Sequence, residues 1–113
     1  STFGGNPLGC AVAIASMDVC IEEGLEGRSL ELGEYFLQLL RSIPHPDIKE
    51  VRGRGLFIGM ELKVPARSYC EKLKDLGLLC KETHESIIRF APPLIITKTE
   101  LDQAAEIVRQ AFA

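Results

Sequence analysis

Apolar residues recur with helical spacing in four segments of the chain, and these segments predict four helices. They cover residues 7–23, 25–42 and 65–76, and a last helix that begins at the Thr-x-x-Glu capping box of residues 97–100. The second segment has a single apolar face, formed by Leu32, Phe36, Leu39, Leu40 and Ile43. The expected inner faces of the third and last helices are Ala66, Tyr69, Leu73 and Leu76, and Leu101, Ala105, Val108 and Phe112. Glycine at 24 and 77 and proline at 44 mark where the first three helices end.

The segment 7–23 differs from the others because its first half has no polar face. Small residues such as Gly9, Ala11 and Ala13 lie on almost every side of it, so neighbours can approach closely on more than one side. A domain of 113 residues cannot readily surround a helix at its own edge. We therefore expect a second domain or subunit to cover this helix.

Strand patterns occupy residues 48–52, 56–63, 78–80 and 87–90. Gly53 and Gly55 flank Arg54 and predict a tight or bulged connection between the first two strands, and residues 81–86 form a polar turn. Alternating helices and short strands of this kind predict an α+β fold, in which helices pack on one face of a small, mostly antiparallel sheet. Residues 1–113 are expected to form one domain.

Arg89 is the most unusual residue of the chain because it is the one charge between Ile87 and Ile96. If its strand is buried or half-buried, the cation needs an anionic partner. The planar guanidinium suits a carboxylate held by two parallel hydrogen bonds, and the following Pro92-Pro93 would stiffen the strand exit. Such a residue is a rigid carboxylate clamp, a partner in a structural ion pair, or an arginine that reaches solvent from an edge strand.

The first residues, Ser1-Thr2-Phe3-Gly4-Gly5-Asn6-Pro7, combine hydroxyls and glycines with a helix start. Asn6 suits the N-cap and Pro7 the first helical position, and hydroxyls with free N–H groups there suit a phosphate. A glycine turn that merely leads into a capped helix fits the same spacing. Arg52 and Arg54 are interpreted as solvated turn charges, and His84 as a turn histidine, because no nucleophile or carboxylate set accompanies it.

Composition narrows the functional classes. The net charge of −3 gives no basic excess for nucleic acid or an anionic membrane, and no apolar run is long enough to span a bilayer. The cysteines, Cys10, Cys20, Cys70 and Cys80, form no C-x-x-C pair, so we expect no metal site, and they are interpreted as small buried residues in a reducing compartment. No signal peptide is visible. The absence of an initiator Met suggests that the chain begins inside a longer protein, and a processed N-terminus would look the same.

Three stretches carry a resemblance over essentially the whole chain: STFGGNPL at residues 1–8, VRGRGLFIGMEL at 51–62 and GLLCKETHESIIRFAPPLII at 77–96. The chain resembles the C-terminal small domain of class III (fold type I) pyridoxal-phosphate aminotransferases. The last stretch is the more specific one and is most similar to the ornithine aminotransferases. The resemblance implies that residues 1–24 form the loop and helix that join this domain to a missing large domain.

The resemblance also implies roles for a few residues. Thr2, with Ser1 beside it, corresponds to the residue that reaches the cofactor phosphate of the neighbouring subunit. Arg89 corresponds to the arginine that meets the carboxylate of the amino or keto acid in one half reaction. In ornithine enzymes this arginine pairs with a large-domain glutamate when ornithine binds, and neither Glu61 nor Glu85 matches that glutamate.

No catalytic residue is expected within the chain. In the family, the Schiff-base lysine and the pyridinium aspartate belong to the large domain, so this chain alone is expected to be inactive. As part of a full-length enzyme it implies pyridoxal 5'-phosphate as cofactor, a homodimer, amino-acid and keto-acid substrates and a place in proline and arginine metabolism. The expected location is the cytoplasm, or the mitochondrial matrix in a eukaryote.

Two alternatives remain open at this point. Acetylornithine, 4-aminobutyrate and glutamate-semialdehyde enzymes of the same family share much of the pattern, and the substrate-selecting residues of the large domain are absent. A free-standing α+β module could also capture a small carboxylate through Arg89 without catalysis. The apolar first helix favours the enzyme domain, because an autonomous module would carry polar residues on its outer side.

Overall fold

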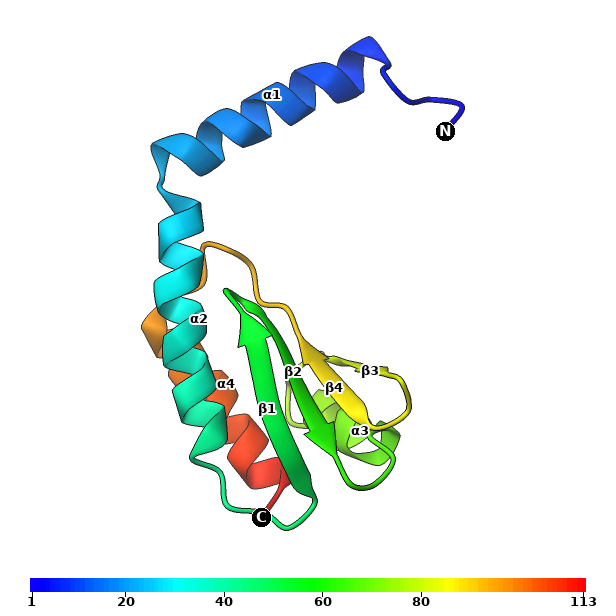
Figure 1. The fold of residues 1–113 in the computed structure, drawn as a ribbon, viewed down its shortest axis with the longest axis vertical. Helices are drawn as coiled ribbons and strands as arrows, with labels where there is room; N and C mark the ends of the chain where they lie inside the picture. The colour runs from blue at the N-terminus through cyan, green and yellow to red at the C-terminus, as the bar shows by residue number, and fades with distance from the viewer.

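Three helices cover one face of a four-stranded sheet in the computed structural model, which describes all of residues 1–113 (Figure 1). The helices are α1 (Pro7–Glu22), α2 (Leu25–Arg41), α3 (Arg67–Asp75) and α4 (Lys98–Ala111). The strands are β1 (Ile48–Arg54), β2 (Phe57–Leu62), β3 (Lys81–Thr83) and β4 (Ile87–Phe90). They pair antiparallel throughout, in the order β1-β2-β4-β3. The predicted fold class is confirmed, and no helix combines the length and apolar composition that a membrane crossing would need.

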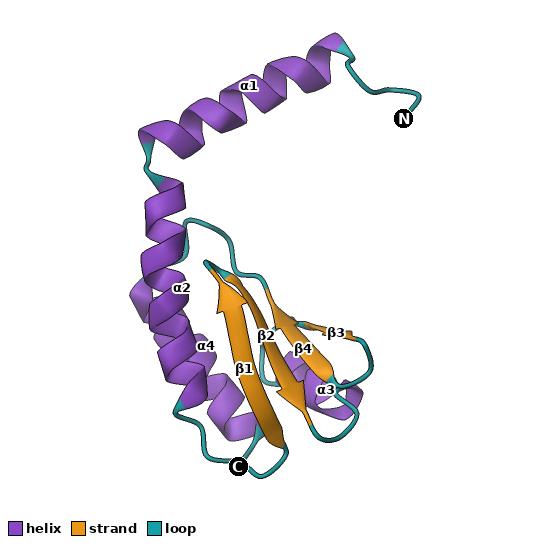
Figure 2. Ribbon diagram, in the orientation of Figure 1, coloured by secondary structure: helices purple, strands orange, loops and turns teal.

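The core forms between the covered face of the sheet and the inner faces of α2, α3 and α4 (Figure 2). Alternate residues of the two central strands supply the sheet side: Ile58, Met60 and Leu62 from β2, and Ile88 and Phe90 from β4. The ring of Phe36 on α2 meets that of Phe90 edge-on, with centroids 6.0 Å apart. The predicted apolar stripe of the last helix is buried in full, and its Thr97 capping box is formed.

The predicted tight β1–β2 connection is confirmed, but it lies further along the chain than expected. β1 continues through Gly53 to Arg54, which lies opposite Phe57, so the turn consists of Gly55 and Leu56. A β-bulge is present, but it lies between Ile48 and Glu50. Gly53 is needed for a close approach within the ladder, because a Cβ there would lie 2.5 Å from the carbonyl oxygen of Phe57.

The third predicted strand is wrong in position. Residues 78–80 are irregular, and β3 instead occupies Lys81–Thr83, inside the predicted polar turn. The three-residue loop 84–86 sets Thr83 opposite Ile87 and Lys81 opposite Arg89. If the β3–β4 pairing continued back to residue 78, that residue would lie opposite Pro92. Proline has no N–H to donate, so it cannot support the pairing there. In the preceding α3, the predicted inner residue Leu76 is 40% exposed, because it caps the helix end rather than facing the core.

Helix α1 leads away from the rest of the molecule (Figure 1). It contains no buried residue, and Leu8, Ile14 and Met17 are among its exposed apolar side chains. Gly24 joins it to α2 with a left-handed φ of 61°. The expectation that a second domain or subunit covers α1 stays a prediction.

The exposure of α1 also overturns the interpretation of the cysteines as buried residues. Cys10 and Cys20 lie on α1 and are exposed, whereas Cys70 and Cys80 are partly buried against the core. The sequence singles out helix α1 as one that its own domain does not cover, and the same argument applied to Cys10 and Cys20 separates the two pairs.

Helix α2 and the β1–β2 turn meet backbone to backbone. A Cβ at Gly33 would lie 2.0 Å from the carbonyl oxygen of Gly55, so only glycine permits this contact. Gly55 itself has a φ of 56°, and the hydroxyl of Ser29 accepts a hydrogen bond from the N–H of Leu56 at 3.2 Å. The helix and the hairpin are therefore fixed to each other at one point.

Substitution of two glycines on the same helix should have opposite effects. Gly33→Ala should destabilise the protein by about 1–3 kcal/mol, because the methyl group forces the helix and the turn apart. Gly27→Ala is the matched control, since nothing lies within 4 Å of a Cβ there, and it should be neutral or stabilise by up to about 1 kcal/mol. Urea denaturation of both variants tests this difference. Equal stability of the two would show that the contact is unimportant.

Candidate substrate carboxylate site

The uncovered face of the sheet carries a row of cationic side chains on β1, β4 and β3, and the row crosses β2 at a glycine. Arg52 on β1 lies opposite Gly59 on β2, Gly59 lies opposite Arg89 on β4, and Arg89 lies opposite Lys81 on β3. Residues directly opposite one another project from the same face. Gly59 has no side chain, so the surface between Arg52 and Arg89 is left open.

Arg89 is an unpaired cation on this face. It is exposed, while its neighbours Ile88 and Phe90 are buried, and no carboxylate of the chain forms an ion pair with it. The strand is half-buried, as expected, and its alternation places the cation on the open side. The strand is also not at the edge of the sheet. The edge-strand alternative for Arg89 is therefore wrong, and no ion pair within the chain holds this residue.

A shallow groove of about 640 Å³ surrounds Arg89. The groove is lined by Arg52, Gly53, Arg54, Phe57, Ile58, Gly59, Thr83, His84, Ile87 and Arg89. The guanidinium carbon of Arg89 lies 6.0 Å from the centroid of the Phe57 ring, at the limit of a cation–π contact. The groove contains no acidic residue, so it favours an anion.

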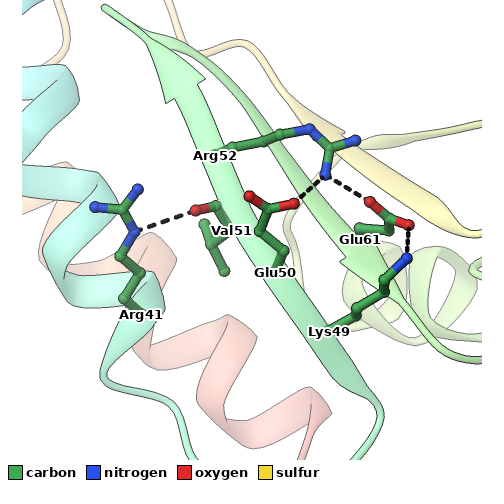
Figure 3. Close-up of polar contacts among 6 residues, drawn as sticks. All are labelled: Arg41, Lys49, Glu50, Val51, Arg52 and Glu61. Atoms are coloured by element: carbon green, nitrogen blue, oxygen red, sulfur yellow. Dashed lines mark hydrogen bonds and ion pairs between the residues drawn. The ribbon is translucent and has the colours of Figure 1, made fainter.

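The neighbouring Arg52 is already neutralised (Figure 3). Its guanidinium contacts the carboxylates of Glu61 at 2.6 Å and Glu50 at 3.0 Å, and Glu61 also contacts the ammonium of Lys49 at 2.7 Å. Hydrogen bonds from Lys49 and Arg52 lower the pKa of Glu61, and the bond to Glu61 raises the pKa of Arg52. Arg52 is therefore a paired strand residue, not the solvated turn charge expected from sequence.

Arg54 and His84 border the groove without completing a catalytic set. Arg54 ends β1 and has no ion pair within the chain. His84 lies in the β3–β4 loop with a positive φ of 49°, and its Nδ1 is 3.1 Å from the hydroxyl of Thr83. This position agrees with the interpretation of His84 as a turn residue.

The other predicted site residues, Ser1 and Thr2, lie at the far end of α1 from the sheet (Figure 1). The Asn6 side chain fixes the turn that follows them, because its Nδ2 donates to the carbonyl of Phe3 at 2.7 Å and its Oδ1 accepts from the N–H of Gly9 at 2.8 Å. Both predicted residues are exposed, and no hydrogen bond within the chain uses their hydroxyls. The structure therefore does not bring them together with Arg89.

The residues present fit only part of a pyridoxal phosphate site. Exposed hydroxyls beside the start of α1 suit the phosphate group. A covalent site needs a lysine in apolar surroundings, but all the lysines, Lys49, Lys63, Lys72, Lys74, Lys81 and Lys98, are exposed. The chain can thus supply contacts to the cofactor but has no fitting lysine.

Comparison with known proteins gives concordant matches over the chain. An ornithine aminotransferase of Geobacillus sp. (strain WCH70) is 72% identical over 113 residues, which are all of this chain and 28% of that protein. Ornithine aminotransferase 2 of Staphylococcus aureus (strain Mu50) is 68% identical over 99% of the chain and 28% of its own length. The chain thus spans little more than a quarter of the curated relatives it matches.

Solved structures agree with the sequence matches. The acetylornithine aminotransferase of Elizabethkingia anophelis superposes with a TM-score of 0.94 at 40% identity, over 99% of this chain and 31% of that one. An ornithine aminotransferase of Toxoplasma gondii superposes with a TM-score of 0.91 at 41% identity, over 99% of this chain and 28% of that one. The family model for class III aminotransferases matches residues 1–112. The chain therefore belongs to the class III aminotransferase family.

Proposed function

We propose that residues 1–113 are the C-terminal small domain of an ornithine δ-aminotransferase. The full-length enzyme would convert ornithine and 2-oxoglutarate to glutamate 5-semialdehyde and glutamate. The observation that carries this proposal is Arg89, an unpaired arginine on a central strand in a groove without acidic residues. The names of the relatives that are 68–72% identical support the choice of ornithine.

In this proposal Arg89 holds the carboxylate of the glutamate or 2-oxoglutarate substrate. Two parallel N–H···O hydrogen bonds would fix both the distance and the plane of the carboxylate. Strands β2 and β3 hold the backbone of Arg89 on both sides, so the backbone loses little conformational freedom on binding. The Glu50 and Glu61 carboxylates are occupied by Arg52 and Lys49, which leaves the charge of Arg89 available for substrate.

The remaining roles of the chain concern cofactor and assembly. Pyridoxal 5'-phosphate, when bound, supplies the electron sink for amino-group transfer. Ser1 and Thr2 would donate hydrogen bonds to its phosphate in the neighbouring subunit of a homodimer. Residues 1–24 would join this domain to the large domain, and the apolar surface of α1 would be covered by that domain and the partner. The free cysteines support a reducing location, the cytoplasm or a mitochondrial matrix.

A second candidate is another member of the family. The acetylornithine aminotransferase of Elizabethkingia anophelis has the same fold over this region, and Arg89 would serve a glutamate half reaction there equally well. The two candidates differ in the amino donor, so comparison of ornithine with acetylornithine as donor for the full-length enzyme separates them.

The isolated chain should not attach pyridoxal phosphate covalently. All of its lysines are exposed, so none is placed in the apolar surroundings that a reactive lysine needs. Borohydride reduction followed by mass spectrometry should reveal no stoichiometric adduct at any single lysine. A specific adduct accompanied by a defined absorbance band would overturn the assignment of the lysine to a missing domain.

Arg89→Lys in the full-length enzyme should impair the glutamate half reaction far more than the ornithine half reaction. Lysine keeps the charge but loses the bidentate geometry. Loss of one charge-assisted hydrogen bond should cost about 1.5–3 kcal/mol, or roughly ten- to a hundredfold in kcat/KM. Single-turnover rates with glutamate and with ornithine measure the difference.

Arg52→Lys is the matched control for this experiment. Arg52 lies on the same face but is already paired with Glu50 and Glu61, so its replacement should change the two half reactions to a similar, small extent. If Arg89→Lys instead slows both halves equally and lowers the melting temperature, Arg89 is a structural residue and the proposed clamp is wrong.

A further inference from the structure

Two contacts between helix α3 and the segment that follows it bracket a pair of cysteines, Cys70 and Cys80. The outermost link is the ion pair between Arg67 and Glu82, at 3.0 Å. The innermost is the hydrogen bond from the N–H of Leu78 to the carbonyl of Leu73, at 2.8 Å. In sequence, Cys70 lies between Arg67 and Leu73, and Cys80 lies between Leu78 and Glu82. The chain therefore folds back on itself with the two cysteines at corresponding positions of the two segments.

The surroundings of the two thiols agree with this placement. Cys70 and Cys80 line one small hollow of about 240 Å³, beside Leu79 and the charged residues of α3. Both side chains pack partly against the core, and each thiol influences the pKa of the other. Neither cysteine borders the Arg89 groove, so the proposed aminotransferase chemistry does not account for the pair.

We propose that Cys70 and Cys80 form a redox modification site that closes into an intramolecular disulfide and ties α3 to the start of β3. This role is separate from transamination. Residue 80 immediately precedes Lys81, which lies opposite Arg89 in the sheet, so the bond would fix the strand that flanks the groove.

A disulfide of the glutathione type is the oxidant in this step. The Cys70 thiol loses its proton, and the thiolate attacks one sulfur of oxidised glutathione, which releases one glutathione thiolate. The Cys80 thiol then loses its proton, and its thiolate attacks the Sγ of Cys70 in this mixed disulfide, which forms the Cys70–Cys80 bond and releases the second glutathione as a thiolate. The two released glutathione thiolates take up two protons. In total, two protein thiols are oxidised to one disulfide and one oxidised glutathione is reduced to two glutathione molecules.

The environment of the pair sets how readily it reacts. Burial raises the pKa of Cys70, and it raises the pKa of Cys80 to about 12. Both groups are therefore protonated near neutral pH, and since only thiolates attack disulfides, oxidation should be slow at pH 7 and accelerate as the pH rises through 8 and 9.

The other cysteines of the chain provide an internal comparison. Cys10 and Cys20 lie on the same helix, α1, and ten residues of helix separate their Cα atoms by about 15 Å along the axis. A disulfide requires Cα atoms within about 7 Å. These two exposed thiols can form mixed disulfides with glutathione but cannot pair with each other.

The test is a disulfide map of the full-length enzyme after incubation with oxidised glutathione at about pH 8.5. After alkylation and digestion with trypsin without reduction, the link should join peptide 68–72 to peptide 75–81, because Lys72 and Lys74 lie between the cysteines. The two thiols should disappear together and return with dithiothreitol. A Cys10→Ser/Cys20→Ser variant should keep the link, and Cys80→Ser should lose it and retain glutathione on Cys70.

Three results would overturn the proposal. One is a stable glutathione adduct on Cys70 in the unsubstituted enzyme, because a neighbouring Cys80 should displace it. Another is a link from either cysteine to a different cysteine. The last is the persistence of both thiols after prolonged incubation with excess oxidised glutathione at about pH 9. Each readout is a peptide mass, so none depends on whether the proposed aminotransferase activity is correct.

Discussion

Burial of one face of the sheet beneath α2, α3 and α4 is the constraint on which the rest of the structure depends. Met60 and Ile88 are 0% exposed at the centre of this interface, and they lie opposite each other on adjacent strands. Because side chains alternate along a strand, their burial forces Gly59 and Arg89 to the opposite face. A shift of the strand pairing by one residue would bury the arginine and expose its apolar neighbours. The core therefore determines where the proposed clamp projects.

The helices were largely predictable because their ends carry local chemical signals. Asn6 with Pro7, Gly24, and the Thr97 capping box each satisfy or interrupt backbone hydrogen bonding in a way that depends only on nearby residues. β3 was not predictable in the same way. Its position depends on the length of the loop after it and on where β4 stops, and both are properties of the pairing rather than of residues 78–83 themselves.

Only the part of the candidate site that has a local sequence signal could be predicted. Arg89 stands out because charge is rare in its segment. The sequence did not reveal that Arg89 is exposed, because Ile87, which lies on the same open face, is apolar as well. Phe57 and Gly59 were missed, because only the pairing of β2 with β4 brings them beside Arg89. The surroundings of Thr2 could not be derived, because nothing in this chain contacts its hydroxyl.

One left-handed residue, Gly24, sets the direction in which α1 leaves the domain. Helix α1 has 16 residues and is therefore a rigid arm of about 24 Å. A rotation of about 10° at Gly24 would move the far end of that arm by about 4 Å, more than the length of a hydrogen bond. If Ser1 and Thr2 hold the cofactor phosphate as proposed, their hydroxyls would have an angular tolerance of only a few degrees. A residue that resists positive φ at position 24 would then displace them without touching them.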